Sequence, residues 1–130
     1  MKQEKGTKNF KDLIMWQKGM MIAKRTYDMA ASMPANEKYG ITSQICRAAV
    51  SVPSNIAEGY SHTSNKNTKI FLEMALGSCY ELETQLLIMA ERNWIPEDKV
   101  TSILRMVTEE QRMLNSYISK IKIGLTQSNH

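Results

Sequence analysis

Residues 47–60, RAAVSVPSNIAEGY, place Pro53 between two runs of apolar residues that share one period. The apolar residues recur at three- and four-residue steps on both sides of the proline, and they are Ile41, Ile45, Ala48, Val52 and Ile56. This spacing is typical of one face of an amphipathic helix. Because the period continues past Pro53, the stretch predicts a single helix that bends at the proline. Gly59 suits the left-handed position that ends a helix.

The same helix carries a ridge of polar side chains. At about 100° per residue they project along one line, with small or apolar residues on both flanks, and they are Gln44, Arg47, Ser51, Asn55 and Glu58. A polar ridge between two apolar surfaces predicts a buried network, in which Arg47 pairs with a carboxylate such as Glu58 or Glu81. Such a network adds little stability but specifies how helices pack.

Catalysis is the alternative interpretation of this serine-containing stretch. A serine nucleophile needs a base within hydrogen-bond reach and an oxyanion hole. The only histidines are His62, in a polar linker, and His130, the last residue. The glutamates also lack the Glu-x-x-His pairs of metal-binding bundles. The sequence therefore predicts a protein that is not an enzyme and has neither a cofactor nor a metal site.

Three further segments show the helical period. The first begins near residues 10–12 and ends before Pro34, and its stripe is Leu13, Trp16, Met20, Ala23, Tyr27 and Ala31. The next is capped by Ser64 or Asn65, and its stripe is Leu72, Ala75, Leu76, Cys79, Leu82, Leu86 and Ala90. The last follows Pro96, and its stripe is Val100, Ile103, Leu104, Val107, Gln111, Leu114, Ile118 and Ile121.

Short connections between four amphipathic helices predict an all-α protein, an antiparallel up-and-down four-helix bundle over residues 10–123. Residues 1–9 are expected to form a flexible basic N-terminus, and residues 124–130 a flexible tail after Gly124. Cys46 and Cys79 lie inside apolar patterns without a CxxC neighbour, which favours buried free thiols over a disulfide or a metal pair. No stretch approaches the ~20 apolar residues of a membrane span. We therefore expect a cytoplasmic protein without a membrane partner.

Charge is unevenly distributed along the chain. Residues 1–25 carry seven Lys and Arg against two acids, whereas residues 73–98 carry one against six. Lys11, Lys18 and Arg25 repeat every seven residues and form a basic ridge. Together with other cations of the first and last helices they are candidates for binding nucleic acid, and the full set is Lys11, Lys18, Lys24, Arg25, Arg105 and Arg112. The alternative is an ordinary solvated helix face.

The first helix is apolar on more than one face, and the last helix repeats this more weakly. In a bundle of this size no helix is central, so a second apolar stripe predicts an oligomer interface. Methionines suit such adaptable contacts. The predicted interface residues are Ile14, Met15, Met21, Ile22, Met29, Met106, Met113 and Tyr117.

Three stretches resemble a known family: LIMWQKGM, YGITSQICRAAVSVPSNIAEGY and FLEMALGSCYELETQL. They are similar to bacterial four-helix-bundle proteins first noticed as reading frames in intervening sequences of large-subunit ribosomal RNA genes. They also resemble the accessory variability determinant protein of diversity-generating retroelements. The resemblance covers roughly residues 10–123, and SVPSNIAEG is its most specific part.

The resemblance implies an up-and-down bundle that assembles as a homopentameric ring or barrel. It also implies a basic surface that, in the retroelement relatives, contacts nucleic acid and a reverse transcriptase. Other members often carry Gly-Arg after the EGY-like motif, where this chain has Ser61 and His62. The sequence therefore favours a self-associating module that binds RNA, DNA or a nucleic-acid-processing enzyme. A protein-binding scaffold without nucleic-acid binding is the alternative.

Overall fold

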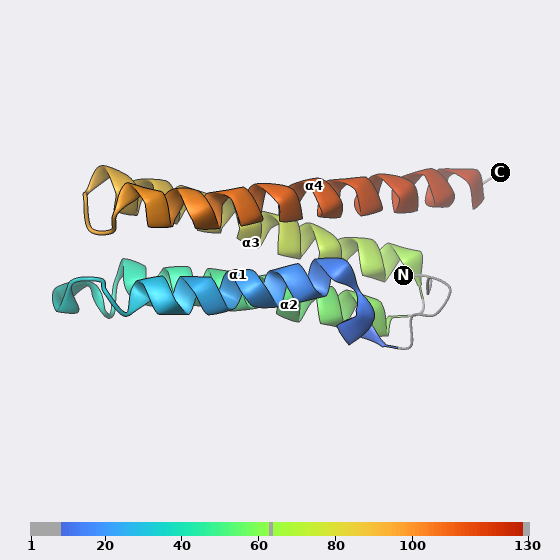
Figure 1. The fold of residues 1–130 in the computed structure, drawn as a ribbon. Coiled ribbons are helices and arrows are strands. Elements are labelled where there is room, and N and C mark those ends of the chain that lie inside the picture. Colours follow the sequence, from blue (N-terminus) through green and yellow to red (C-terminus); the bar gives the residue numbers. More distant parts are fainter. Residues whose placement is uncertain (1–8, 63, 129–130) are drawn as a thin grey trace.

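The structure is a computed structural model that describes residues 9–62 and 64–128. Its elements are the short 3-10 helix η1 (Phe10–Asp12), α1 (Ile14–Ala30), the 3-10 helix η2 (Ala35–Glu37), α2 (Ile41–Ser61), α3 (Asn65–Glu91) and α4 (Glu97–Ser128). The four α-helices alternate in direction, and each packs on its neighbours in the order α1, α2, α3, α4 (Figure 1). The predicted all-α four-helix bundle is confirmed.

Helix α2 runs without interruption through Pro53, which is buried, as the periodicity predicted. The helix ends at Ser61, and the prediction that Gly59 terminates it is wrong. Gly59 instead lies where α2 meets the start of α3. A Cβ atom on this glycine would lie 3.3 Å from the Cβ of Phe71 and 3.4 Å from the carbonyl oxygen of Thr68. The missing side chain therefore permits a close approach of the two helices.

Both ends of α3 are stabilised by local hydrogen bonds. The Ser64 hydroxyl accepts a hydrogen bond from the backbone N–H of Asn67 at 3.1 Å, so Ser64 is the N-cap, as predicted. At the other end Asn93 has a φ of 58°. The backbone N–H of Trp94 then donates to the carbonyl of Met89 at 3.1 Å, which is the pattern of a Schellman motif.

Helix α4 is the longest element and follows its predicted stripe, with Val107 and Leu114 fully buried. It continues through Gly124 to Ser128, beyond residue 123, where the bundle was expected to end. Its last turns extend beyond the ends of the other helices (Figure 1). Residues 1–8, 129 and 130 of the two predicted flexible ends lie outside the described residues.

The core face of α1 differs from the predicted one. Met15, Ile22 and Met29, assigned to an oligomer interface, are 3%, 0% and 4% exposed and belong to the core. Tyr27, assigned to the core stripe, is 53% exposed. Because α1 carries apolar side chains on several faces, its periodicity alone left the inward direction open. Packing against α2 and α4 selects the face that carries Met15, Ile22 and Met29 together with Gly19.

Both cysteines are free, as predicted. Cys79 is buried in α3, and burial is the first cause that raises the pKa of its thiol to about 12. Cys46 is only partly buried, and desolvation raises its pKa as well. Within residues 9–62 and 64–128, no helix has the length and apolar character that crossing a membrane requires.

Candidate nucleic-acid interface and the carboxyl group beneath it

The structure places two of the six predicted nucleic-acid-binding residues, Lys18 and Arg25, where α1 meets α4, and two more, Arg105 and Arg112, on α4 beside this contact. The Lys18 ammonium group donates a hydrogen bond to the carboxylate of Glu109 on α4. Arg25 lines a surface cavity of ≈ 350 Å³ between the two helices. Arg105 lines a neighbouring cavity on α4. Arg112 lies close enough to Glu109 to contribute to the lowering of that residue's pKa.

The remaining two predicted residues lie apart from this group. Lys11 is exposed beside η1, where its ammonium nitrogen is 6.0 Å from the centroid of the Phe10 ring. Lys24 is also exposed on α1. It projects about 100° away from its neighbour Arg25, because successive helix positions differ by that angle. The seven-residue repeat therefore predicted the face of α1 that carries Lys18 and Arg25, but it did not show how far this basic face extends along the bundle.

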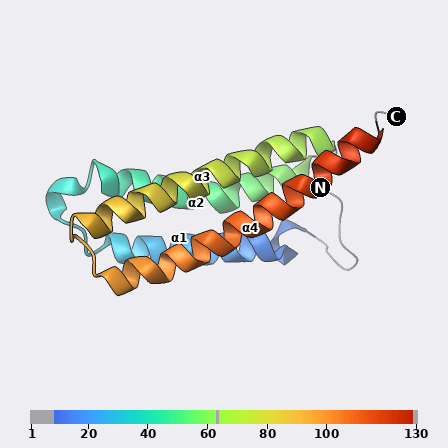
Figure 2. The same cartoon turned by 90° about the horizontal axis from the view of Figure 1, so that it is seen from above.

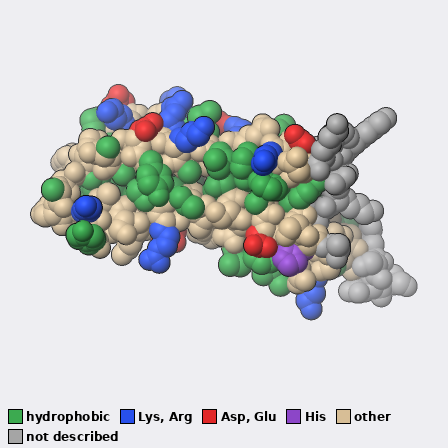
Figure 3. Space-filling view, turned by 90° about the horizontal axis from the view of Figure 1, so that it is seen from below, with side chains coloured by type: hydrophobic (Ala, Val, Ile, Leu, Met, Phe, Trp, Pro, Cys, Tyr) green, Lys and Arg blue, Asp and Glu red, His purple; other side chains and the backbone are tan. Residues whose placement is uncertain are grey.

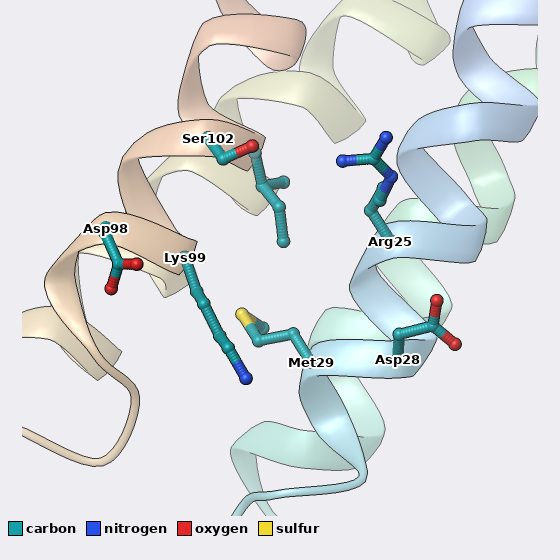
Figure 4. Close-up of a pocket in the computed structure, with 7 residues that line it drawn as sticks. Arg25, Asp28, Met29, Asp98, Lys99 and Ser102 are labelled. Atoms are coloured by element: carbon teal, nitrogen blue, oxygen red, sulfur yellow. The ribbon is translucent and has the colours of Figure 1, made fainter.

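The cavity beside Arg25 offers several hydrogen-bond donors above an apolar floor. Figure 4 shows Arg25 and Met29 projecting from α1, with Lys99 and Ser102 on the opposite wall formed by α4. Met29 and Ile103 are buried and form the floor. Guanidinium, ammonium and hydroxyl groups in this arrangement are the groups that hold phosphate oxygens.

Acidic side chains moderate the positive charge of this face. Asp28 and Asp98 line the same cavity as Arg25. Glu109 carries a lowered pKa, first because Lys18 donates a hydrogen bond to it and then because of the charges of Lys18 and Arg112. Lys18 is therefore already partnered by a carboxylate, whereas Arg25, Arg105 and Arg112 are exposed. These three arginines are the stronger candidates for contacts with an anionic partner.

The predicted oligomer-interface residues fall into two groups. Ile14 and Met21 are 62% and 45% exposed, and Met106, Met113 and Tyr117 are partly buried. Ile14 lines a cavity between α1 and α4 together with Met113 and Tyr117. The other group, Met15, Ile22 and Met29, packs in the core as described above. An interface in this region would use only the first group.

An apolar groove between α1 and α2 did not emerge from the sequence. It has a volume of ≈ 380 Å³ and is lined by Trp16, Met20, Ala23, Val50, Pro53, Ser54 and Ala57. Figure 3 shows the hydrophobic side chains in a band along the face of α1 and α2, with Lys and Arg side chains near its edges. Trp16, Met20 and Ala23 carried a signal for this groove, because the sequence placed them on a single stripe. That stripe faces the groove and not the centre of the bundle.

The prediction of a buried polar network along α2 is wrong. Gln44, Arg47, Glu58 and Glu81 are all exposed, and they lie at or near the outer edge of the contact between α2 and α3. Glu58 lies 3.8 Å from His62, and Glu81 accepts a hydrogen bond from Gln85 at 3.2 Å, so neither forms the predicted pair with Arg47.

Only the short side chains of the ridge are partly buried. The hydroxyl groups of Ser51 and Ser78 are hydrogen-bonded to each other across α2 and α3. The side-chain amide of Asn55 donates to the carbonyl oxygen of Ser51 at 2.8 Å. The small side chains let the two helices approach closely, and this approach leaves the long polar side chains on the surface.

The buried polar group that the sequence missed is Glu110 on α4. Its side chain is fully buried, with 0% exposure, and neither carboxyl oxygen has a hydrogen-bond partner among the described residues. Burial raises the pKa of this carboxyl group to about 8, and the charge of Lys18 opposes the shift. The sequence did carry a signal: Glu110 follows Val107 by three residues and precedes Leu114 by four, so it lies on the apolar stripe.

Gly19 and Pro53 lie next to the Glu110 carboxyl group, and neither donates a hydrogen bond to it. A Cβ atom on Gly19 of α1 would lie 3.1 Å from Oε2 of Glu110 and 3.3 Å from the Cβ and nitrogen of Pro53. Proline has no backbone N–H to offer. Glu110 therefore lies where α1, α2 and α4 meet, closed to bulk solvent and without a hydrogen-bond partner among the described residues.

The described residues contain no group of three or more His, Cys, Asp and Glu side chains that would hold a metal ion.

A comparison with protein families matches residues 11–116 to the 23S rRNA-intervening sequence proteins. The chain belongs to this family. The matched residues include α1, α2, α3 and most of α4. The resemblance of the three sequence stretches to the intervening-sequence proteins is thereby confirmed.

A solved structure from Bacteroides thetaiotaomicron supports the fold of this family member. It is a protein of unknown function from the S23 ribosomal protein family, with 25% sequence identity and a TM-score of 0.75. The match covers 81% of this chain and 98% of that chain. No curated protein matches the chain.

His62 marks a departure of this member from the Gly-Arg pattern that the resemblance implied. Its ring stacks on Phe71 with the ring centroids 4.9 Å apart and an angle of 15° between the planes. Ser61 donates a hydrogen bond to the carbonyl oxygen of Glu58 at 2.7 Å. Both residues thus serve the packing of the turn between α2 and α3.

Proposed function

We propose that this protein is a non-enzymatic, self-associating helical module that binds the phosphate backbone of RNA or DNA through the face of α1 and α4. The observation that carries the proposal is the convergence of cations from both ends of the chain. Arg25 comes from α1, and Arg105 and Arg112 come from α4, yet all three lie on or beside one exposed face.

The chemistry of this face supports contacts to phosphate more than contacts to bases. Its donors are long, exposed side chains, and such contacts fix position without reading sequence. Aromatic side chains on which bases would stack are sparse there, with Tyr117 partly buried at one end. We therefore expect weak sequence preference and a steep dependence of affinity on salt concentration.

A charge-reversal experiment tests this face. The variant Arg25→Glu, Arg105→Glu, Arg112→Glu is expected to lower affinity for a hairpin RNA and a DNA duplex by about tenfold or more at low salt, because each contact to phosphate releases counterions. The matched control is Arg47→Glu, Lys66→Glu, Lys120→Glu, which makes the same change in net charge at three exposed positions elsewhere. Gel shifts at two salt concentrations measure both variants.

Two outcomes would contradict the proposal. Equal losses in the two triple variants would show that only net charge matters and not this face. Absence of binding by the unchanged protein at low salt would favour the scaffold without nucleic-acid binding.

A reverse transcriptase or another nucleic-acid-processing enzyme is the protein partner that the resemblance to the retroelement relatives supports.

Self-association is the second part of the proposal, and the apolar groove between α1 and α2 supports it. We assign a second copy of this chain as its occupant. Helix α3 presents exposed Ile70, Met74 and Ile88 together with exposed Glu73 and Glu81. This acidic and apolar surface complements an apolar groove with Lys and Arg side chains near its edges (Figure 3). Contacts between two different faces of one chain generate a closed ring when the rotation between copies closes, and a pentamer is the ring we expect.

Light scattering tests the self-association. The unchanged protein is expected to form an oligomer at micromolar concentration, and the variant Met20→Lys, Val50→Lys is expected to reduce it to monomers, because two charges would be buried in the contact. The control Tyr39→Lys changes a residue that is 89% exposed in the turn before α2 and leaves the groove intact. A monodisperse monomer of the unchanged protein would contradict this part of the proposal.

A further inference from the structure

Glu110 is the one buried acidic side chain among the described residues, and neither the proposed interface nor the proposed self-association uses it. Native proteins almost always give a buried carboxyl group a hydrogen-bond or charge partner. Here both oxygens lack a hydrogen-bond partner within the described part of the chain. A group kept in this condition is stable only in its neutral form, because an isolated buried carboxylate is strongly disfavoured.

The surroundings of Glu110 contain few charges that would stabilise a carboxylate. On α1 the nearest cation is Lys18, which already donates to Glu109. On α3 the neighbours are Cys79 and Glu83, and both Glu83 and Glu110 raise the pKa of the Cys79 thiol. Helix α2 contributes the uncharged Pro53. On α4 itself Glu109 is exposed, and its carboxylate is hydrogen-bonded to Lys18. Among the described residues Lys18 is therefore the charge that favours an ionised Glu110, and it is already committed to Glu109.

Water reaches this carboxyl group most easily if α1 moves. Gly19 is the closest point of α1, and a Cβ atom there would lie only 3.1 Å from Oε2 of Glu110. The contact between α1 and α4 is the least extensive of the four contacts between neighbouring helices. Helix α4 also crosses the bundle obliquely, and its last turns extend away from α1 (Figure 2). Separation of α1 from α4 is therefore the opening that disrupts the least packing.

We propose that the protonation state of Glu110 controls whether α1 stays packed against α4, so that this contact depends on pH. The neutral carboxyl group is compatible with the packed helices. When the carboxyl group ionises, α1 separates from α4 so that water can hydrate the carboxylate. The extensive contacts of α2 with α3 and of α3 with α4 persist. The raised pKa of about 8 places this change just above neutral pH. The inference stands independently of nucleic-acid binding.

Fluorescence of Trp16 reports on a displacement of α1, because Trp16 lies on this helix and is partly buried in the groove between α1 and α2. The chain has two tryptophans, so Trp94→Phe leaves Trp16 as the single emitter. In this background the acrylamide quenching constant is expected to rise about twofold or more between pH 6 and pH 9.5, with a midpoint near the pKa of about 8. The helical circular dichroism signal is expected to remain, since only one helix moves.

Two substitutions of adjacent residues decide the assignment. Glu110→Gln is expected to abolish the pH dependence of quenching, whereas Glu109→Gln, which removes an exposed carboxylate one position away, is expected to retain it. Should the Gln variant fold poorly, Glu110→Met serves the same purpose with an apolar side chain of similar length. Quenching that is independent of pH in the parent, or that rises equally in Glu110→Gln, would overturn the proposal.

Discussion

Replacing Glu110 with Met is expected to make the protein more stable above neutral pH and to remove most of the pH dependence of its stability. The carboxyl group has a pKa of about 8 in the folded chain against 4.5 as its ordinary value. Between these two values the unfolded chain has lost the proton and the folded chain has kept it. The free energy of unfolding therefore falls as pH rises from about 4.5 to 8 and then levels off.

The size of this effect is large relative to the stability of a small domain. A pKa difference of one unit corresponds to about 1.4 kcal/mol, so the loss through Glu110 approaches ~5 kcal/mol as an upper limit, against a typical total of about 5–15 kcal/mol. We expect Glu110→Met to gain about 2–4 kcal/mol at pH 8.5 and little at pH 4.5. Denaturant unfolding at a series of pH values measures both.

Glu109→Gln is the control for this prediction. The pKa of Glu109 is lowered, chiefly by the hydrogen bond from Lys18, so its contribution to stability is present at neutral pH and is lost as pH falls into the acid range. The two adjacent glutamates are thus expected to have opposite pH profiles. A stability of Glu110→Met that follows the same pH curve as the unchanged protein would refute the burial of a neutral carboxyl group.

Replacing Gly19 with Val is expected to destabilise the bundle by about 3 kcal/mol, because there is no space for a side chain where α1 crosses α2. A Cβ atom at this position would lie 3.3 Å from the backbone nitrogen of Pro53 and 3.1 Å from Oε2 of Glu110. The proline nitrogen belongs to the backbone of a buried helix and cannot move aside as a flexible side chain does. The two helices must then separate, which exposes Ile22 and Val52 in the core.

Gly77 provides a matched comparison, because it also lies inside a helix. A Cβ atom on Gly77 would meet nothing within 4 Å. Gly77→Ala is therefore expected to stabilise the protein by about 0.5–1 kcal/mol, since alanine favours the helix over glycine. Gly19→Ala is expected to lose this benefit and destabilise by about 1 kcal/mol. Equal gains in stability from the two alanine variants, measured by thermal unfolding, would show that a methyl group fits between α1 and α2 at position 19.

The candidate site was only partly accessible from the sequence. Lys18, Arg25, Arg105 and Arg112 were found from their seven-residue spacing, which places side chains on one face of each helix. The spacing of a single helix does not state which residues of another helix lie opposite. The partnership of Lys18 with Glu109 joins positions 91 residues apart in the chain, and it required the structure. So did the apolar groove, which two helices form together.

The sequence by itself determined the four helices and their approximate limits. Their apolar period, the Ser64 cap and the continuation of the period through Pro53 are local patterns, which can be recognised without knowledge of the rest of the fold. Which face of α1 is buried, that the ridge around Arg47 lies on the surface, and that Glu110 is enclosed were decided only by tertiary structure. The physical reason is that burial depends on how closely helices approach. Gly19, Ser51 and Gly59 set that distance by the side-chain atoms they lack.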